Sequence, residues 1–490
     1  MMATTADGVA QPFGWPKRTQ RRVVLALLGL YVLGFCALWP NALLVSDETH
    51  YVGQAIVFAR GEATQEVRQV LEGTRVRQPA STYPVGTSAV QAPFVKLGGW
   101  RLAALPSLFA MAGTVLVLLK WLAEINRPPI FALLPLLFIG TLVQGRLAMS
   151  DALTALISSL TFWLFSRGER GGRFAWVGSG FFAGLSAVFR DPTPLLYAPL
   201  FAGTLVRRER KAWQLVAGGV LGVSIRLITA KLLFGAALFL RMGGALSFGA
   251  IPANVPLYAF ILICAFPLGL PSLFLHRSQR KPELILGVLA MIVVYLVFPL
   301  PHEASGLVRD VVLHARYCTA LVPLFAFTLA EWIPRWIAGR ERLRRTVTIG
   351  AVMATVVLIL SVHIFLYTWG KTLERIRQAI YSTTPEGSVL LINPTATAKF
   401  LSEAFGHRDR INRPNATPNT VAQFVSKHEP VYAVFVDRTE TEFRRQDAAD
   451  NTTFLQALQG RCQVDALHDA QESAIERVRI ARISHCSADP

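Results

Sequence analysis

Eleven apolar segments follow one another along the first three quarters of the chain, and all but two short ones, 152–166 and 193–206, are close to the length that crosses a bilayer. A membrane helix needs about 20 apolar residues, because lipid offers no hydrogen-bond partner to exposed backbone groups. Of the 490 residues, 52% are hydrophobic and only 16% are charged, which is too apolar for a soluble fold. We predict a polytopic α-helical membrane protein whose transmembrane helices lie at 22–40, 102–122, 129–147, 152–166, 174–190, 193–206, 212–235, 256–275, 284–300, 316–337 and 346–369.

The basic residues lie between these segments in a regular order. Residues 371–490 carry equal numbers of basic and acidic side chains, so the whole net charge of +18 belongs to residues 1–370. This position excludes a nucleic-acid-binding arm as the main cause of the charge and indicates the positive-inside signal of cytoplasmic connections. Clusters of Lys and Arg alternate with the remaining connections and occur at 17–22, 167–173, 207–211, 277–281 and 340–345.

The alternation predicts a multi-pass protein of the cytoplasmic membrane. Its N-terminus would be cytoplasmic, and an odd number of spans would place residues 371–490 outside the cytoplasm. A cleaved signal peptide is the alternative for residues 1–40, but no A-x-A-like cleavage site follows the apolar run. We therefore expect an uncleaved first span.

The outward connections hold the polar residues that could carry chemistry. The long loop 41–101 begins with Ser46, which we expect to cap an amphipathic interfacial helix containing Asp47, Glu48 and Tyr51. A turn at Tyr83 to Gly86 follows it. Further polar residues on the same predicted side are Arg146, Asp151, Arg190, Asp191, His302, Glu303, Arg316 and Tyr317.

After the last apolar segment the composition becomes that of a soluble domain. The runs 389–392 and 431–436 are typical of buried strands, and helical patterns occur around 396–406, 419–427 and 452–459. We predict a small extracytoplasmic α/β domain over residues 371–490. Cys462 and Cys486 are its only cysteines, and an oxidising compartment would permit a disulfide, although the sequence does not show that they meet.

The outward residues, taken in chain order, resemble a known pattern. An Asp-Glu pair and a Tyr follow the first span, then come a Tyr-Pro-x-Gly turn, an Arg followed by an Asp at a span start, and an Arg-Tyr leading into Pro. These residues are Asp47, Glu48, Tyr51, Tyr83 to Gly86, Arg146, Asp151, Arg316, Tyr317 and Pro323. The pattern resembles the GT-C superfamily of glycosyltransferases, in the branch of the protein O-mannosyltransferases and the bacterial lipid A aminoarabinose transferase. The resemblance covers residues 1–370, and the sequence lacks the Lys that the aminoarabinose branch has near the Tyr-Pro turn.

The resemblance implies transfer of a sugar from a polyprenyl-phosphate donor to a lipid, glycan or protein acceptor, with inversion, in a cavity at the outer face. It implies catalytic roles for Asp47, Glu48 and Asp151, and contact of Arg316, Tyr317 and Arg190 with the donor phosphate. The cavity would be lined by Tyr51, Tyr83, Arg146, His302 and Glu303. Metal dependence varies within the superfamily, so Asp47 and Asp151 are compatible with a divalent metal ion or with none.

General chemistry leads to the same residue types. An inverting transfer needs a carboxylate to take the proton of the acceptor hydroxyl, and a cation to stabilise the departing phosphate. Asp47 and Asp151 could supply the first, and Arg316, Arg190 or Arg226 the second.

Each assignment has a structural alternative. Asp47 and Glu48 could simply begin a helix, Asp151 could cap one, and Arg316 could anchor a span end at the interface. For the whole chain, the alternative is a transporter or lipid flippase, but such proteins place polar sites near the midplane, often in repeated halves. Here the acids lie at the outer ends of spans and no repeat is visible, which favours an enzyme over a transporter.

Overall fold

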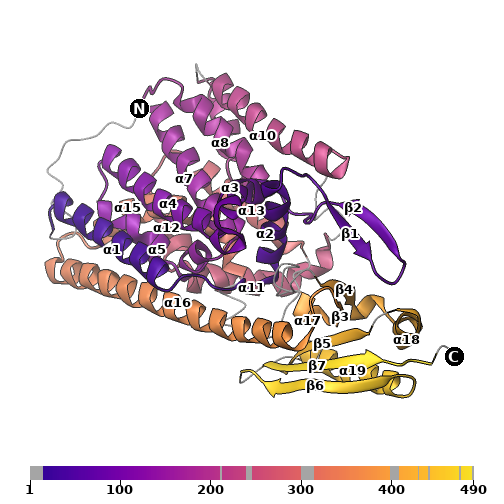
Figure 1. The fold of residues 1–490 in the computed structure, drawn as a ribbon. Helices are drawn as coiled ribbons and strands as arrows, with labels where there is room; N and C mark the ends of the chain where they lie inside the picture. The colour runs from indigo at the N-terminus through magenta and orange to yellow at the C-terminus, as the bar shows by residue number, and fades with distance from the viewer. Residues whose placement is uncertain are drawn as a thin grey trace.

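The computed structural model describes residues 15–209, 212–238, 246–298, 314–397, 408–428, 430–439, 442–473 and 476–487. It consists of an α-helical membrane domain followed by an α/β domain (Figure 1). Five helical segments are long and apolar enough to cross a membrane, or seven if two bent pairs each count as one span. The polytopic helical fold with a C-terminal α/β domain is thus confirmed, while the number of 11 crossings stays a prediction.

Every predicted span corresponds to a helix or to neighbouring helices. The long segments are α1 (Lys17–Ala37), η1 with α4 (Trp100–Leu102 and Leu105–Glu124), α7 (Ser150–Glu169), α10 (Ala212–Phe234), η6 with α15 (Ala315–Leu321 and Val322–Trp336) and α16 (Glu341–Thr383). The shorter ones are α8 (Ala175–Phe189), η4 with α9 (Thr193–Leu196 and Ala198–Val206) and α13 (Lys281–Leu296). Two predicted spans are broken: one into η2, α5, α6 and η3 (Pro129–Leu133, Leu134–Leu137, Ile139–Leu142, Gln144–Arg146), the other into η5, α11 and α12 (Phe248–Ala250, Ile251–Cys264, Gly269–Leu275).

Glycines set the packing of α8 against α10. Gly180 and Gly184 on α8 face Gly218 and Gly222 on α10, and a Cβ at any of these positions would clash with the backbone of the opposite helix. Small residues at a spacing of four let two membrane helices approach to backbone contact, where lipid provides no hydrophobic driving force between them. The glycines of α10 at positions 218 and 222 therefore serve helix packing.

The connections predicted to be cytoplasmic are tied to one another. Arg280 pairs with Glu169 at 2.9 Å and also with Glu209, and Arg170 pairs with Glu124 at 2.9 Å. Further pairs join Arg207 to Glu283 and Arg127 to Glu331. These ion pairs bring several of the connections on one predicted side close together in space.

The long loop after α1 contains more structure than the sequence suggested. It forms α2 (Ser46–Ala59), the hairpin β1–β2 (Gln65–Gln69 and Thr74–Gln78, antiparallel) and α3 (Gly86–Gly98). Ser46 does not cap α2, because the helix begins at Ser46 and the Glu48 carboxylate accepts the Leu44 and Val45 amides instead. The face of α2 that carries Tyr51 and Val52 is buried within the protein.

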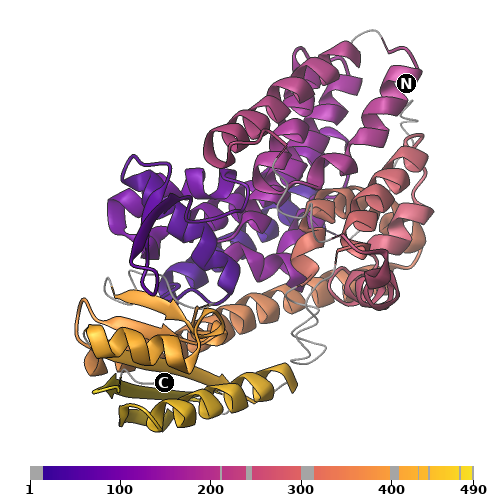
Figure 2. The ribbon, with the colours of Figure 1, turned by 90° about the vertical axis from the view of Figure 1, so that its right-hand side faces the viewer.

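The last membrane helix leads directly into the C-terminal domain. At a rise of 1.5 Å per residue, the 43 residues of α16 extend for about 65 Å, and the predicted domain boundary at residue 371 falls inside this helix. Figures 1 and 2 show it running along the bundle to the sheet.

The C-terminal domain is a five-stranded mixed sheet with the order β4-β3-β5-β7-β6. Its strands are β3 (Val389–Ile392), β4 (Asp409–Asn412), β5 (Val431–Arg438), β6 (Gln463–Gln471) and β7 (Glu476–Ser484). Its helices are α17 (Pro394–Thr397), η8 (Arg413–Asn415), α18 (Pro418–Lys427) and α19 (Glu442–Gln459). Strands β3 and β5 and helices α18 and α19 confirm the predictions for 389–392, 431–436, 419–427 and 452–459. Most of the predicted helix at 396–406 lies outside the described residues. Strands β4, β6 and β7 were not predicted.

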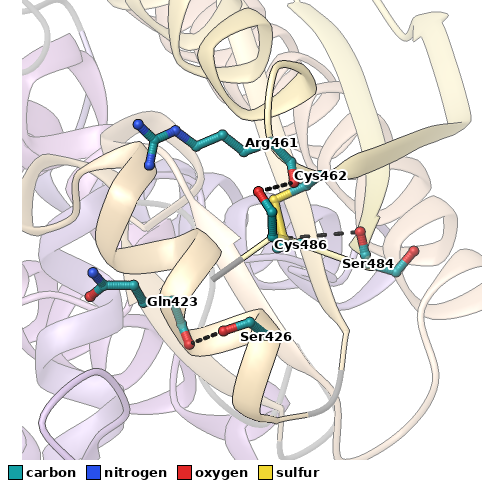
Figure 3. The surroundings of a disulfide bond; sticks show 7 residues. Gln423, Ser426, Arg461, Cys462, Ser484 and Cys486 are labelled. Carbon is teal, nitrogen blue, oxygen red and sulfur yellow. Dashed lines mark hydrogen bonds between the residues drawn. A yellow bond between two sulfur atoms is a disulfide. The ribbon is translucent and has the colours of Figure 1, made fainter. Parts of the chain in front are cut away.

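Two contacts fix the edges of this domain. Cys462, after α19, and Cys486, after β7, form a disulfide (Figure 3). The β1–β2 hairpin docks on the sheet, because Val70 at its turn packs into the core of the domain and Arg68 pairs with Asp409 at 2.8 Å. The loop after α1 and the C-terminal domain therefore lie on the same side of the molecule.

Candidate active site

Two arginine–aspartate pairs converge at one end of the membrane helices. Asp47 lies in the first turn of α2, and its Oδ2 is 2.8 Å from Nη1 of Arg316, at the start of η6. Asp151 lies in the first turn of α7 and pairs with Arg190, the residue that ends α8. Four segments that are distant in sequence thus bring two aspartates and two arginines together, and their charges sum to zero.

Tyr317 joins the two pairs into one cluster. Its ring centre is 4.8 Å from the guanidinium carbon of Arg316 and 5.0 Å from that of Arg190. Arg316 also donates a hydrogen bond of 2.9 Å to the Tyr317 hydroxyl. A guanidinium at this distance is attracted by the ring quadrupole, which holds both cations without consuming all of their N–H groups.

Several polar atoms of the cluster have no hydrogen-bond partner among the described residues. They are Asp151 Oδ2, Arg190 Nε and Arg316 Nε, each shielded from solvent. Buried donors and acceptors are costly when unpaired, and each one calls for an explanation. Guanidinium groups with N–H capacity to spare are suited to bind the oxygens of an anionic ligand.

Hydroxyl and aromatic side chains surround the acids. Tyr51 donates to, or accepts from, the Ser150 hydroxyl at 3.1 Å, and Arg190 donates to the same oxygen at 3.3 Å. The ring of Tyr83 lies 4.9 Å from that of Tyr51 and 5.4 Å from that of His50. The predicted cavity residues Tyr51 and Tyr83 therefore lie together beside the Asp47 helix.

Glu48 points away from this cluster. Its side chain is buried, and both of its oxygens accept backbone amides, from Leu44, Val45 and Ala148. Burial raises the pKa of the Glu48 carboxyl to about 7, against the opposing effect of these three hydrogen bonds. Glu48 therefore stabilises the backbone around the site and does not join the arginine–aspartate cluster.

Arg146 is likewise directed elsewhere. Its guanidinium donates to the carbonyl oxygen of Leu38 at the end of α1 and lies 2.7 Å from Nδ1 of His363 on α16. It also lies over the Phe35 ring at 5.7 Å. The structure thus places Arg146 between α1 and α16, apart from the two acid–base pairs.

Three other predicted residues have different outcomes. Arg226 pairs with Asp191 at 2.7 Å, so this arginine does not join the Tyr317 cluster. His302 and Glu303 lie outside the described residues.

The side chains around the two acids bear on whether a metal ion could bind there. In the described part of the chain, no group of three or more His, Cys, Asp or Glu side chains is placed to hold a metal ion. Asp47 and Asp151, the acids that a metal would use, each face a guanidinium. This donor set fits an anion better than a cation, and no step proposed below uses a metal.

Sequence reasoning missed Ser150 and Tyr295 as neighbours of the site. The ring of Tyr295, on α13, lies 4.8 Å from that of Tyr317. Its only sequence signal is an isolated tyrosine in an apolar run, and Ser150 has none beyond its position next to Asp151.

Comparison with known proteins identifies the fold. No protein-family model matches the chain, and no curated protein matches it in sequence. Two solved structures of ArnT from Cupriavidus metallidurans match it at 14% identity, covering 94% of this chain and 97% of theirs. The TM-score is 0.61 for the apo structure and 0.58 for the structure bound to undecaprenyl phosphate. The fold that the GT-C resemblance implied is confirmed over nearly the whole chain.

Proposed function

We propose that this chain is an integral membrane glycosyltransferase that transfers a sugar from a polyprenyl-phosphate donor to an extracytoplasmic lipid, glycan or protein acceptor, with inversion. The observation that carries the proposal is the pair of arginine–aspartate contacts around Tyr317, in a fold shared with ArnT. One of the similar structures is bound to undecaprenyl phosphate, which supports a polyprenyl lipid as the donor carrier.

The ion pairs define the state of the site before substrate binds. An unpaired charge is costly at membrane depth, so each arginine is neutralised by an acid. A lipid phosphate would first bind the Arg316 Nε–H, which lacks a partner among the described residues. It would then compete with Asp47 for Nη1 of the same guanidinium. Binding of the donor phosphate thereby frees the Asp47 carboxylate to act as a base.

The transfer step follows from this exchange. The acceptor hydroxyl oxygen attacks the anomeric carbon while its proton passes to Asp47. The bond from the anomeric carbon to the phosphate oxygen breaks, and the electron pair leaves with the phosphate. Arg316 and Arg190 stabilise the charge on that phosphate, as preorganised donors do most effectively in a site sheltered from water. The lipid phosphate is a good leaving group, so no acid has to protonate it.

The second acid has a supporting role in this scheme. Asp151 is buried and paired with Arg190, and its backbone carbonyl accepts the Thr319 hydroxyl at 3.2 Å. It orients Arg190 toward Tyr317 and links the start of α7 to η6. The site would face the outer side of the cytoplasmic membrane, with the N-terminus inside and the C-terminal domain outside.

A transfer assay on the full chain in lipid nanodiscs tests the proposal. The assay supplies radiolabelled polyprenyl-phosphate sugars in turn, with membrane extract as acceptor. We expect label to move from one donor with the wild type and with Glu283→Gln, which removes an arginine-paired carboxylate at the opposite end of the helices. Asp47→Asn should slow that transfer by roughly 10²- to 10⁴-fold. Undiminished transfer by Asp47→Asn would refute the role of Asp47 as the general base. If the wild type transferred sugar from no donor, a transporter or flippase would become the favoured function, to be tested by a flux assay.

A further inference from the structure

Two buried side chains, called the clamp below, hold the backbone N–H and C=O groups of Ala148, close to the two acids of the site. On one side, Oε1 of Glu48 accepts the Ala148 amide at 2.7 Å. On the other, Nε2 of Gln91 donates to the Ala148 carbonyl oxygen at 2.9 Å. Glu48 and Gln91 are both buried, and they come from α2 and α3.

Both oxygens of Glu48 accept backbone amides. Oε2 accepts the Leu44 amide at 2.6 Å and the Val45 amide at 3.1 Å, which holds the start of α2. Oε1 is committed to Ala148. A general acid or base must reach the proton that it transfers, and this carboxylate is surrounded by backbone amides instead.

The clamp acts close to both acids. Asp47 is the residue before Glu48, and the Ala148 peptide lies just ahead of Met149, whose extended backbone leads into α7 and Asp151. Helix α3 is hydrogen-bonded both to α2 and to the segment before α7. Ser88 donates to the Tyr51 carbonyl oxygen at 2.8 Å, and Gln91 donates to the Ala148 carbonyl oxygen. The distance between the two acid-bearing helix starts is therefore set by Glu48, Gln91 and Ser88.

We infer that Glu48 is a positioning residue. Together with Gln91 it fixes the backbone of Ala148, so that Asp47 and Asp151 are held at the separation that one substrate requires. This inference rests on the proposed glycosyl transfer and assigns Glu48 a role different from that of a catalytic acid. Its chemistry explains why a carboxylate is used, since one carboxylate can accept three amides. A glutamine has a single acceptor oxygen, and its NH₂ group would face amide donors.

The proposal predicts a specific kinetic pattern. A shift of the reacting groups by about 1 Å can cost 10²-fold in rate. Glu48→Gln and Gln91→Leu should each lower kcat by about tenfold or more, with the donor KM within about threefold of wild type, because the phosphate contacts of Arg316 and Arg190 are untouched. Since both side chains hold the backbone of one residue, Ala148, the double variant should lose less than the product of the single losses.

Gln54 provides a matched control on the same helix. It is also buried, donates to the Ala63 carbonyl oxygen at 3.1 Å and accepts the Ser81 amide at 3.3 Å, and neither of these hydrogen bonds involves Ala148. Gln54→Leu removes two buried side-chain hydrogen bonds from α2, neither of them part of the clamp. It should leave kcat unchanged.

Hydrogen exchange on the full chain in nanodiscs supplies a readout that needs no activity. We expect faster amide exchange in residues 143–151 for Glu48→Gln and Gln91→Leu, and wild-type exchange there for Gln54→Leu. Unchanged exchange in both clamp variants would overturn the inference, as would a Glu48→Gln enzyme that loses kcat while Gln91→Leu stays fully active, the result expected of a catalytic acid. If the wild type transfers no sugar at all, the proposed function fails, while the exchange result still decides whether the clamp exists.

Discussion

Replacing Asp47 by Asn should slow sugar transfer and, at the same time, tighten the binding of the lipid phosphate. The two effects have opposite directions because Asp47 has two roles in the proposed cycle. In the resting site it neutralises Arg316 across 2.8 Å, and in the reaction it takes the acceptor proton. Both side chains are largely shielded, with 17% and 14% of their surfaces exposed, so water does little to screen the contact.

The magnitudes follow from the two roles. Loss of a general base costs roughly 10²- to 10⁴-fold in rate, which corresponds to about 3–5 kcal/mol in the activation free energy. A hydrogen bond to a charged partner contributes roughly 1.5–3 kcal/mol, and the donor phosphate must displace this contact to reach Arg316. Because Asn retains a weaker, neutral hydrogen bond, we expect the Kd for polyprenyl phosphate to fall by about tenfold, or about 1.4 kcal/mol.

Two measurements on the same nanodisc preparation check this prediction. Equilibrium binding of labelled polyprenyl phosphate gives the Kd, and single-turnover transfer gives the rate of the chemical step. Glu283→Gln is the control, because it also leaves an arginine without its carboxylate but at the other end of the helices. Weaker phosphate binding by Asp47→Asn would refute the competition between carboxylate and phosphate, even if the rate falls.

Four further predictions test other parts of the structure. Gly184→Leu should force α8 and α10 apart and lower the free energy of unfolding by about 1–3 kcal/mol. Gly29→Ala in α1, where a Cβ meets nothing within 4 Å, should not lower the melting temperature in detergent. Cys462→Ser opens a loop with a sequence separation of 24 and should destabilise the C-terminal domain by about 3 kcal/mol in denaturant titrations; equal midpoints for variant and wild type would contradict a stabilising disulfide. Burial raises the Glu48 pKa from 4.5 to about 7, so between these pH values the folded state binds more protons than the unfolded state. The free energy of unfolding should therefore fall by about 3 kcal/mol as the pH rises from 4.5 to 7. Melting curves of Glu48→Gln should lack this pH dependence. Reporter fusions should place residues 371–490 outside the cytoplasm, and cytoplasmic activity there would overturn the outward position of the site.

Much of the fold could be predicted because membrane segments and buried strands leave local signals. Each predicted span forms helix, since lipid requires every backbone group to be satisfied within the segment. The run 431–436 forms β5, because a fully buried strand is continuously apolar. The strand β7 was missed although Val478, Ile480 and Ile483 are buried along it, because charged residues alternate with them and interrupt the apolar run.

The sequence by itself determined which residues are available to the site. Asp47, Asp151, Arg190 and Arg316 stand at ends of apolar segments on one predicted side, a property that length and charge order encode locally. Only the tertiary structure decided their pairing, which joins Asp47 to Arg316 and Asp151 to Arg190.

Tertiary structure also decided the roles of residues that the pattern could not separate. Glu48 follows Asp47 directly, yet the helical turn directs it to Ala148 instead of the arginines. Arg146 precedes Asp151 by a few positions, yet it reaches α1 and α16. Adjacent residues on a helix point about 100° apart, and their partners lie a hundred or more residues away along the chain. Local sequence fixes the direction of a side chain relative to its helix, while the packing of the other helices determines what it meets.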